Sequence, residues 1–296
     1  MRVLRQMLTP ETDSLLKEFI GAATNLDSLD NYKYFNATAE RIVEHIKGTQ
    51  GASGSRAFLR AVLERTISIW ISEGRYQQLP PLCARFHAAQ LDRIAKDNNA
   101  AADWLDLGDD LFQKEFGIVS LRLYVAGSNL VDHRCGIPRS IIFREGLIRA
   151  FSNLRFILYR KGFKPYFQGH LHKFMLSSLS EEGRNDFYRC CAELFALPPN
   201  SLGVFCSSWY YDPALDRISP WLSYLRKIPV SNGAQLFFVE EGGVAINYSL
   251  AKSQTRRRLY EEGKYHPRTY MFVWGRNDLI AWANKAHADK DSRHYN

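Results

Sequence analysis

Apolar and polar positions alternate in a regular order in the last third of the chain. Short apolar runs rich in β-branched and aromatic residues predict strands at 204–211, 234–239 and 269–274. Between and after these runs, apolar residues at helical spacing predict helices at 220–228, 248–265 and 278–288, with Ser219 as a cap and Pro229 as a stop. Strands that alternate with helices of this length favour an α/β layer with at least partly parallel pairing.

The first hundred residues have helical patterns instead. The spacing of apolar residues and the capping residues predict helices at 10–22, 37–47, 56–73 and 81–96. The glycine-rich segment 48–54 predicts a loop tip or a mobile lid, since it lacks the lysine and the preceding strand of a phosphate-binding P-loop. An acidic segment follows at 100–116. Its aspartates could share one helix face and bind a divalent cation, or form a solvated face; they are Asp103, Asp106, Asp109 and Asp110.

The pattern changes near Gly117. We predict a strand at 118–125, a polar loop at 131–138, a basic helix at 144–160, a strand at 164–171 and a helix at 181–197 capped by Ser180. We therefore predict a helical region at 1–116 and a mixed-sheet α/β (or α+β) domain at 117–296.

Composition narrows the class of protein. The 296 residues are 46% hydrophobic and carry a formal net charge of +8, which favours an anionic partner or is simply the charge of a mildly basic enzyme. The five cysteines are odd in number and lack paired spacing, which favours a reducing, cytoplasmic compartment. The sequence contains no apolar run long enough for a signal peptide or a membrane span, so we expect neither.

His170 and His172 are the most conspicuous candidates for chemistry. Residues two apart on a strand point to the same face, so both imidazoles could meet one substrate or one metal. A metal would need a third ligand, which Asp132, His133 or Cys135 could supply. The alternatives are one histidine acting as a general base and a structural pair.

Two other groups contain reactive or charged side chains. The adjacent Cys190 and Cys191 fit buried packing, and Cys206 lies in an apolar strand without a nucleophile-elbow motif. The segment 252–268 carries six basic residues against Glu261 and Glu262. It predicts either a solvated helix or a clamp for phosphates, and interleaved aromatic residues would also suit nucleic acid.

The stretch Leu259-Tyr-Glu-Glu-Gly-Lys-Tyr265, after strand, helix and strand patterns, resembles the second half of the N-acetyltransferase (GNAT) superfamily. This resemblance covers about the last quarter of the chain. It implies an acyl-CoA co-substrate, with Tyr260 near the leaving thiolate as general acid. The nearest counterpart of the family's pyrophosphate loop is 217–221, which would place Ser219 at the phosphates. Pro220 departs from the family pattern there, because it has no amide donor.

These observations lead to one expected function and two alternatives. We expect an acyl-CoA-dependent acyltransferase acting on a small-molecule amine or hydroxyl acceptor, with His170 or His172 as base and Arg256 and Arg257 at the cofactor phosphates. The first alternative is a nucleic-acid-binding protein that uses the basic helices. The second is a metal-dependent enzyme built on the two histidines.

Overall fold

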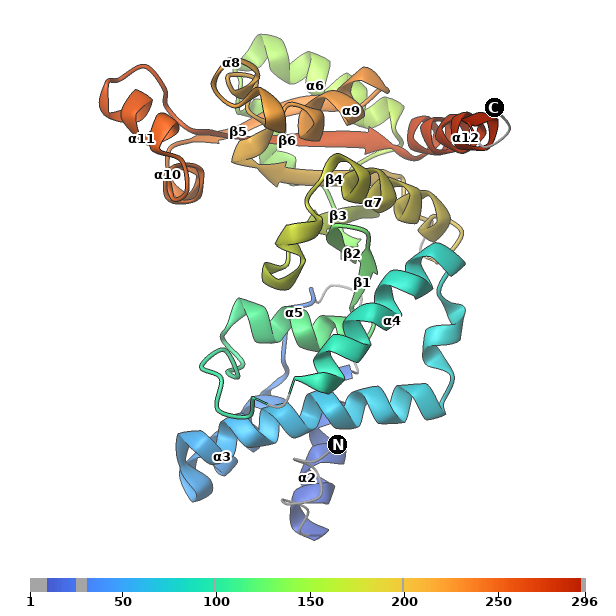
Figure 1. Cartoon of the computed structure of the whole chain (residues 1–296), viewed down its shortest axis with the longest axis vertical. Coiled ribbons are helices and arrows are strands. Elements are labelled where there is room, and N and C mark those ends of the chain that lie inside the picture. The colour runs from blue at the N-terminus through green and yellow to red at the C-terminus, as the bar shows by residue number, and fades with distance from the viewer. Residues whose placement is uncertain (1–9, 25–30, 98, 199, 294–296) are drawn as a thin grey trace. The chain divides into compact units, whose positions relative to one another are not determined.

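The computed structural model describes residues 10–24, 31–97, 99–198 and 200–293, with side chains described up to residue 285. The chain is a mixed α/β protein in which a helical N-terminal region precedes a sheet-containing part, as the sequence predicts (Figure 1). It divides into two units. Unit 1 comprises residues 1–134 and 171–176, and unit 2 comprises residues 135–170 and 177–296.

Unit 1 consists of helices and one hairpin. The helices are α2 (Pro10–Thr24), α3 (Ala37–Ser72), the 3-10 turn η1 (Arg75–Gln78), α4 (Pro81–Lys96) and α5 (Asp110–Val119). Strands β1 (Leu123–Ala126) and β2 (Asn129–Cys135) pair antiparallel. Side-chain caps start two of the helices, because Asn36 and Asp109 accept hydrogen bonds from the amides of Ala39 and Leu111.

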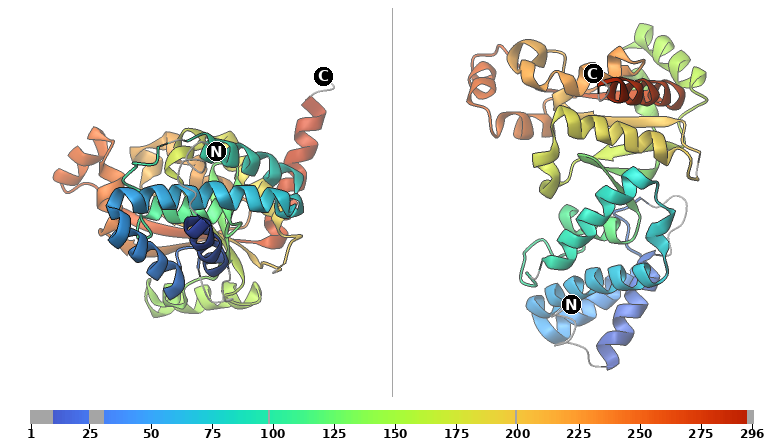
Figure 2. Two further views of the ribbon diagram at one scale, coloured as in Figure 1. Left: turned by 90° about the horizontal axis from the view of Figure 1, so that it is seen from below. Right: turned by 45° about the vertical axis from the view of Figure 1, so that its right-hand side comes forward.

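The predicted glycine-rich loop at 48–54 is wrong, since this segment is part of α3. Only Gly51 leaves the helical conformation, with φ 71° and ψ −176°. The two parts of α3 meet at a sharp bend in the views of Figure 2. A glycine can adopt this conformation at low cost, which explains a bend in place of a loop.

One apolar core holds unit 1 together and includes β1 and β2. Phe19 packs edge-on against Phe58 and Phe116, and Leu123 and Leu130 of the hairpin join the same core. The predicted loop at 131–138 is therefore wrong, because most of it is β2. The expected boundary near Gly117 falls inside α5.

Unit 2 contains four strands in the order β3-β4-β6-β5. They are β3 (Tyr166–His170), β4 (Gly203–Ser208), β6 (Arg268–Gly275) and β5 (Gln235–Glu241). β3 and β4 are parallel, whereas β6 is antiparallel to both β4 and β5. The expectation of a mixed sheet with partly parallel pairing is thus confirmed.

Helices cover both faces of this sheet. They are α6 (Leu147–Tyr159), α7 (Glu181–Leu194), α8 (Leu215–Ile218), α9 (Tyr224–Ser231), α10 (Val244–Leu250), α11 (Gln254–Glu261) and α12 (Arg276–Arg293). Short 3-10 turns are η2 (Arg139–Phe143), η3 (Lys173–Ser178), η4 (Trp209–Tyr211) and η5 (Pro220–Leu222).

The side chains of β6 alternate between the two faces. Met271 and Val273 share a core with Ala150 and Ile157 of α6. Trp274 instead packs edge-on against Tyr188 of α7 and the neighbouring Trp282 of α12. Figure 1 shows α6 and α7 on opposite sides of the strands.

Two helices of the structure have different bounds from those that the sequence predicts. The helix expected at 248–265 is two short helices, α10 and α11, separated at 251–253. Pro229 does not end the preceding helix, because α9 continues to Ser231. In the described part of the chain, no helix has the length and apolar character needed to cross a membrane.

Candidate functional site

One edge of the unit 2 sheet gathers the carboxyl ends of the parallel strands. β3 ends at His170 and β4 ends at Ser208, which pairs with Tyr270 at the start of β6. β5 ends at the same edge, where Glu241 pairs with Arg268. The helices α10 and α11 connect β5 to β6 here. Ligands of open α/β sheets bind outside the carboxyl ends of strands, so this edge is the expected position of a ligand site.

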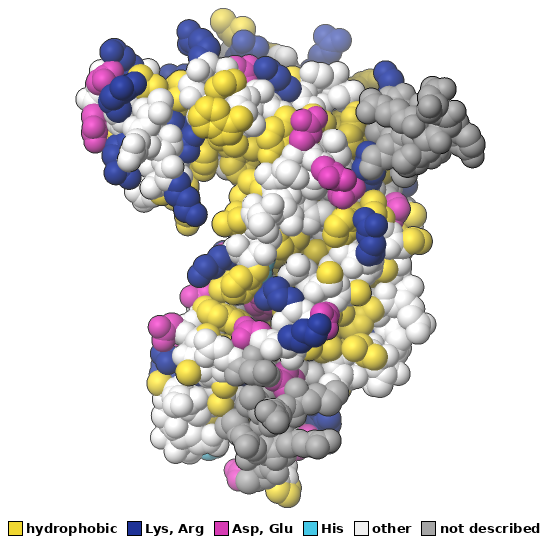
Figure 3. All heavy atoms as spheres, in the orientation of Figure 1, with side chains coloured by type: hydrophobic (Ala, Val, Ile, Leu, Met, Phe, Trp, Pro, Cys, Tyr) yellow, Lys and Arg dark blue, Asp and Glu magenta, His cyan; other side chains and the backbone are white. Residues whose placement is uncertain are grey.

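A pocket of about 380 Å³ lies at this edge. Three aromatic rings, two cations and three smaller side chains line it. The lining residues are Trp209, Trp221, Leu222, Tyr248, Ala251, Lys252, Ser253 and Arg256. Trp221 is 63% exposed and Tyr248 is 69% exposed, so both rings are open to solvent. In Figure 3, Lys and Arg side chains gather over α10 and α11 beside hydrophobic side chains.

Arg256 forms the inner wall of the pocket and is held by three elements. Its Nε donates to the Ser249 carbonyl (2.6 Å) and its Nη1 donates to the Ser219 hydroxyl (2.8 Å). Its guanidinium carbon lies 4.8 Å from the centre of the Trp209 ring. Burial lowers the pKa of Arg256 from its ordinary value, which leaves it charged at neutral pH. The guanidinium has further N–H donors for a ligand.

The structure brings two residues of the sequence hypothesis into direct contact, Ser219 and Arg256. Ser219 precedes the 3-10 turn η5, as expected for a cap, but its side chain makes no capping hydrogen bond there. Its amide donates to the Leu215 carbonyl (2.8 Å) and its hydroxyl accepts from Arg256, so both polar groups have partners inside the protein.

Arg257 and Tyr260 lie on the same short helix as Arg256. Arg257 is exposed, and its Nη2 lies 3.5 Å from the carbonyls of Leu250 and Ala251. Tyr260 lies one helical turn after Arg256, and its ring meets His266 edge-on at 6.1 Å. Tyr260 is therefore on the face of α11 that carries Arg256, outside the residues that line the pocket.

The two histidines do not share a strand. β3 ends at His170, so the alternation that would align His172 with it stops there. His170 belongs to unit 2 and His172 to unit 1. The expected histidine pair on one strand face is therefore wrong.

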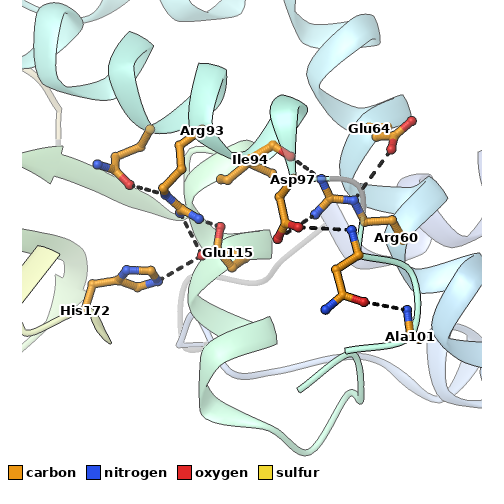
Figure 4. Close-up of polar contacts among 10 residues, drawn as sticks. Arg60, Glu64, Arg93, Ile94, Asp97, Ala101, Glu115 and His172 are labelled. Carbon is orange, nitrogen blue, oxygen red and sulfur yellow. Dashed lines mark hydrogen bonds and ion pairs between the residues drawn. The ribbon is translucent and has the colours of Figure 1, made fainter. Parts of the chain in front are cut away.

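His172 is fully buried in a polar contact of unit 1 (Figure 4). Its Nε2 lies 3.2 Å from Oε1 of Glu115, and its Nδ1 accepts from the Phe174 amide (3.3 Å). Because Nδ1 is an acceptor, the neutral ring carries its proton on Nε2, facing Glu115. Nη2 of Arg93 contacts both oxygens of Glu115 at 2.7 and 2.8 Å. This contact holds segment 171–176 in unit 1.

A second charged contact in Figure 4 surrounds Arg60, which is also fully buried. Its Nε lies 3.5 Å from Glu64 and its Nη1 lies 3.5 Å from Asp97, while Nη2 donates to the Ile94 carbonyl. These contacts join α3 to the end of α4. Their burial assigns them to the packing of unit 1.

A third buried cluster lies under the unit 2 sheet edge. Nη2 of Arg184 donates to the hydroxyls of Tyr188 (2.8 Å) and Tyr211 (2.9 Å). Burial raises the pKa of the neighbouring Cys206 thiol, which therefore stays protonated at neutral pH. Burial likewise raises the pKa of the Cys191 thiol. Neither thiol is an activated nucleophile in this state.

The acidic segment does not form a helix face. Asp103 and Asp106 lie in turns, Asp109 is the cap of α5, and Asp110 begins that helix. Across the residues that the structure describes, no group of three or more His, Cys, Asp or Glu side chains is placed to hold a metal ion.

Three residues of the pocket are absent from the sequence hypothesis as ligand contacts: Trp209, Trp221 and Tyr248. Trp221 follows directly on Ser219-Pro220, where a large ring argues against a phosphate cradle. An aromatic cluster beside the basic 252–258 run is the signal that could have indicated a base-stacking pocket.

Comparison of the chain with protein-family models, curated proteins and solved structures gives no match. The chemistry of the pocket is therefore the basis for assigning a function.

Proposed function

We propose that unit 2 is an acyl-CoA-dependent acyltransferase whose pocket holds the nucleotide end of the CoA donor. The observation that carries this proposal is the set of side chains in the pocket, where exposed Trp221 and Tyr248 rings stand beside Lys252 and Arg256. CoA presents an adenine ring and phosphates together. Aromatic rings stack on adenine, and lysine and arginine bind phosphate.

The position of the pocket supports the same assignment. It lies at the sheet edge where the parallel strands β3 and β4 end, and His170 is the last residue of β3. β3 and β4 pair at Phe167↔Val204 and Gln168↔Phe205, and continuing this register places His170 opposite Ser207. A thioester that extends from the pocket along this edge would reach the strand ends.

The proposed transfer needs one base and one acid. The acceptor nitrogen or oxygen attacks the thioester carbon, and His170 takes the proton from the acceptor. The carbon–sulfur bond then breaks, and Tyr260 gives its proton to the departing thiolate. The products are the acylated acceptor and free CoA. His172 has no part in this step, because Glu115 holds it in the interior of unit 1.

A cytoplasmic location is also a proposal. It rests on the odd number and unpaired spacing of the five cysteines.

Binding of acetyl-CoA to the full chain, measured by calorimetry, tests the pocket. We expect Trp221→Ala to weaken binding by about tenfold or more, because one stacked ring contributes roughly 1–3 kcal/mol. Lys252→Ala should weaken it by roughly tenfold through loss of a charged hydrogen bond to phosphate. Both side chains are exposed, so neither change should affect folding.

Arg258→Ala is the matched control. Arg258 lies on α11, its side chain is 70% exposed, and it is not among the residues that line the pocket. It removes the same charge as Lys252→Ala and should leave the affinity unchanged. Equal weakening by Lys252→Ala and Arg258→Ala, with no effect of the neutral Trp221→Ala change, would mean that CoA is attracted only by net charge. No binding to the unaltered chain would refute the proposal.

Turnover tests the acid and the base separately. We expect Tyr260→Phe to lower turnover by about 100-fold while the affinity for acetyl-CoA stays nearly constant. His170→Gln should also lower turnover and should remove the rise of rate with pH that a titrating base produces. A Tyr260→Phe enzyme with full turnover would exclude Tyr260 from the mechanism.

A further inference from the structure

The helix α6 and the turn before it expose an unusual number of large apolar side chains. Half of the large hydrophobic residues that are exposed in the described part of the chain lie between 143 and 159. Their exposed fractions are 65% for Phe143, 75% for Leu147, 91% for Ile148, 78% for Phe151, 39% for Leu154, 63% for Leu158 and 78% for Tyr159. A contiguous apolar surface of this kind marks a binding surface.

The opposite side of α6 is already packed, so these side chains are not a displaced core. Ala150, Asn153 and Ile157 are the buried residues of the helix, and Ala150 and Ile157 join the core under the sheet. Asn153 Oδ1 accepts a hydrogen bond from Gln235 of β5 (3.0 Å). Leu147, Phe151, Leu154 and Leu158 recur at helical spacing and form a separate stripe.

Cations surround this stripe. Five basic side chains between 139 and 161 are exposed, against the single acid Glu145 in the same stretch: Arg139, Arg144, Arg149, Arg155 and Lys161. No ion pair involves any of the five within the described ranges 10–24, 31–97, 99–198 and 200–293. The surface is thus both apolar and positively charged.

We propose that this surface, residues 139–161, docks the protein on an anionic lipid membrane, with α6 lying in the plane of the interface. The combination favours lipid as the occupant, because apolar side chains enter the acyl boundary while arginines meet lipid phosphates. Nucleic acid would match the arginines but would leave Ile148 and Phe151 without apolar partners. A second copy of the chain would bring the five cations against five identical cations. This inference is independent of the proposed acyl transfer.

Vesicle co-sedimentation of the full chain tests the proposal. We expect binding to mixed vesicles of phosphatidylcholine and phosphatidylserine, and little binding to phosphatidylcholine alone. Binding should weaken as salt is added, because exposed charges are screened.

Two double substitutions separate the apolar and charged contributions. Ile148→Ser with Phe151→Ser should weaken vesicle binding by about 100-fold, since two inserted side chains are lost. Arg149→Gln with Arg155→Gln should weaken it by roughly 30-fold. Each pair has a matched control elsewhere. The control for the apolar pair is Ile71→Ser, which removes an apolar side chain that is 60% exposed. The control for the charged pair is Arg257→Gln with Arg258→Gln, which removes two exposed charges. Neither control should change vesicle binding.

Three results would overturn the proposal. The first is the absence of binding to phosphatidylserine vesicles. The second is a dimer in light scattering that Ile148→Ser with Phe151→Ser abolishes while vesicle binding is unchanged, which would assign the surface to a second copy. The third is tight binding of a single-stranded oligonucleotide that depends on Arg149 and Arg155 but not on Ile148 and Phe151.

Discussion

Single residues in this chain take their roles from partners far away in the sequence. Arg256 contacts Ser219 and Trp209, and His172 contacts Glu115, which is 57 positions away (172 − 115). The sequence indicates that Arg256 and His172 are candidates for ligand binding or chemistry. It does not show that one lines a pocket and the other is buried in a separate unit, because the partners meet only in the fold. The sequence hypothesis names Ser219 and Arg256 only as separate contacts of a cofactor, and the structure shows that they touch each other. It misplaces His172.

His87 on α4 gives a prediction for acid stability. Its Nδ1 accepts from the Val125 amide (3.3 Å), and its Nε2 donates to the Ile118 carbonyl (3.1 Å), so the buried ring fits as the neutral form. Burial lowers the pKa of His87 from 6.5 to about 4. The unfolded chain therefore binds this proton first as the pH falls. The contribution of His87 to the free energy of unfolding should be fully present above pH 6.5 and should fall by roughly 3 kcal/mol between pH 6.5 and pH 4.

Urea unfolding at a series of pH values measures this effect. His87→Gln should remove roughly 2–3 kcal/mol of the acid-induced loss. The exposed His45→Gln should leave the pH dependence unchanged. His133, whose pKa burial also lowers to about 4, contributes in the same direction and remains in both variants. An identical pH dependence for the unaltered chain and His87→Gln would contradict the account.

At the scale of elements, periodic apolar patterns predict most helices and strands. The caps at Asn36 and Ser180 and the strands near 204, 234 and 269 agree with the structure. The failures come where local signals compete with packing. Glycines suggest a loop at 48–54, but Ile46 and Phe58 on either side are buried in one core, so the helix continues through the segment.

Gly51 and Gly48 form a matched pair in α3. At Gly51 the φ of 71° with ψ of −176° is a conformation that other residues avoid, although a Cβ would meet no neighbour. Gly51→Ala should therefore lower the free energy of unfolding by about 1–3 kcal/mol. Gly48 has helical geometry and open space for a Cβ, so Gly48→Ala should raise it by up to about 1 kcal/mol. Urea unfolding of both variants checks this, and stabilisation by Gly51→Ala would show that α3 does not bend there.

At the scale of the whole molecule, the sequence predicts the fold class and the helical start, but not the division into units. The hairpin of β1 and β2 belongs with the helices, because Leu123, Val125 and Leu130 pack into the core of unit 1. Segment 171–176 belongs there too, through Met175 in that core and His172 on Glu115. Such a return of the chain leaves no local signal in the sequence. The pocket lies wholly within unit 2, and its proposed function therefore depends on that unit alone.

Thermal unfolding of the full chain with and without acetyl-CoA is the most direct test of the proposed function. At about 100 times the Kd, a ligand that binds only the folded state adds roughly 2.7 kcal/mol, which corresponds to a rise in Tm of roughly 5 °C or more. We predict this rise for the unaltered chain and its loss in the double variant Trp221→Ala with Lys252→Ala. No rise with acetyl-CoA, or the same rise in the double variant, would contradict a CoA site in this pocket.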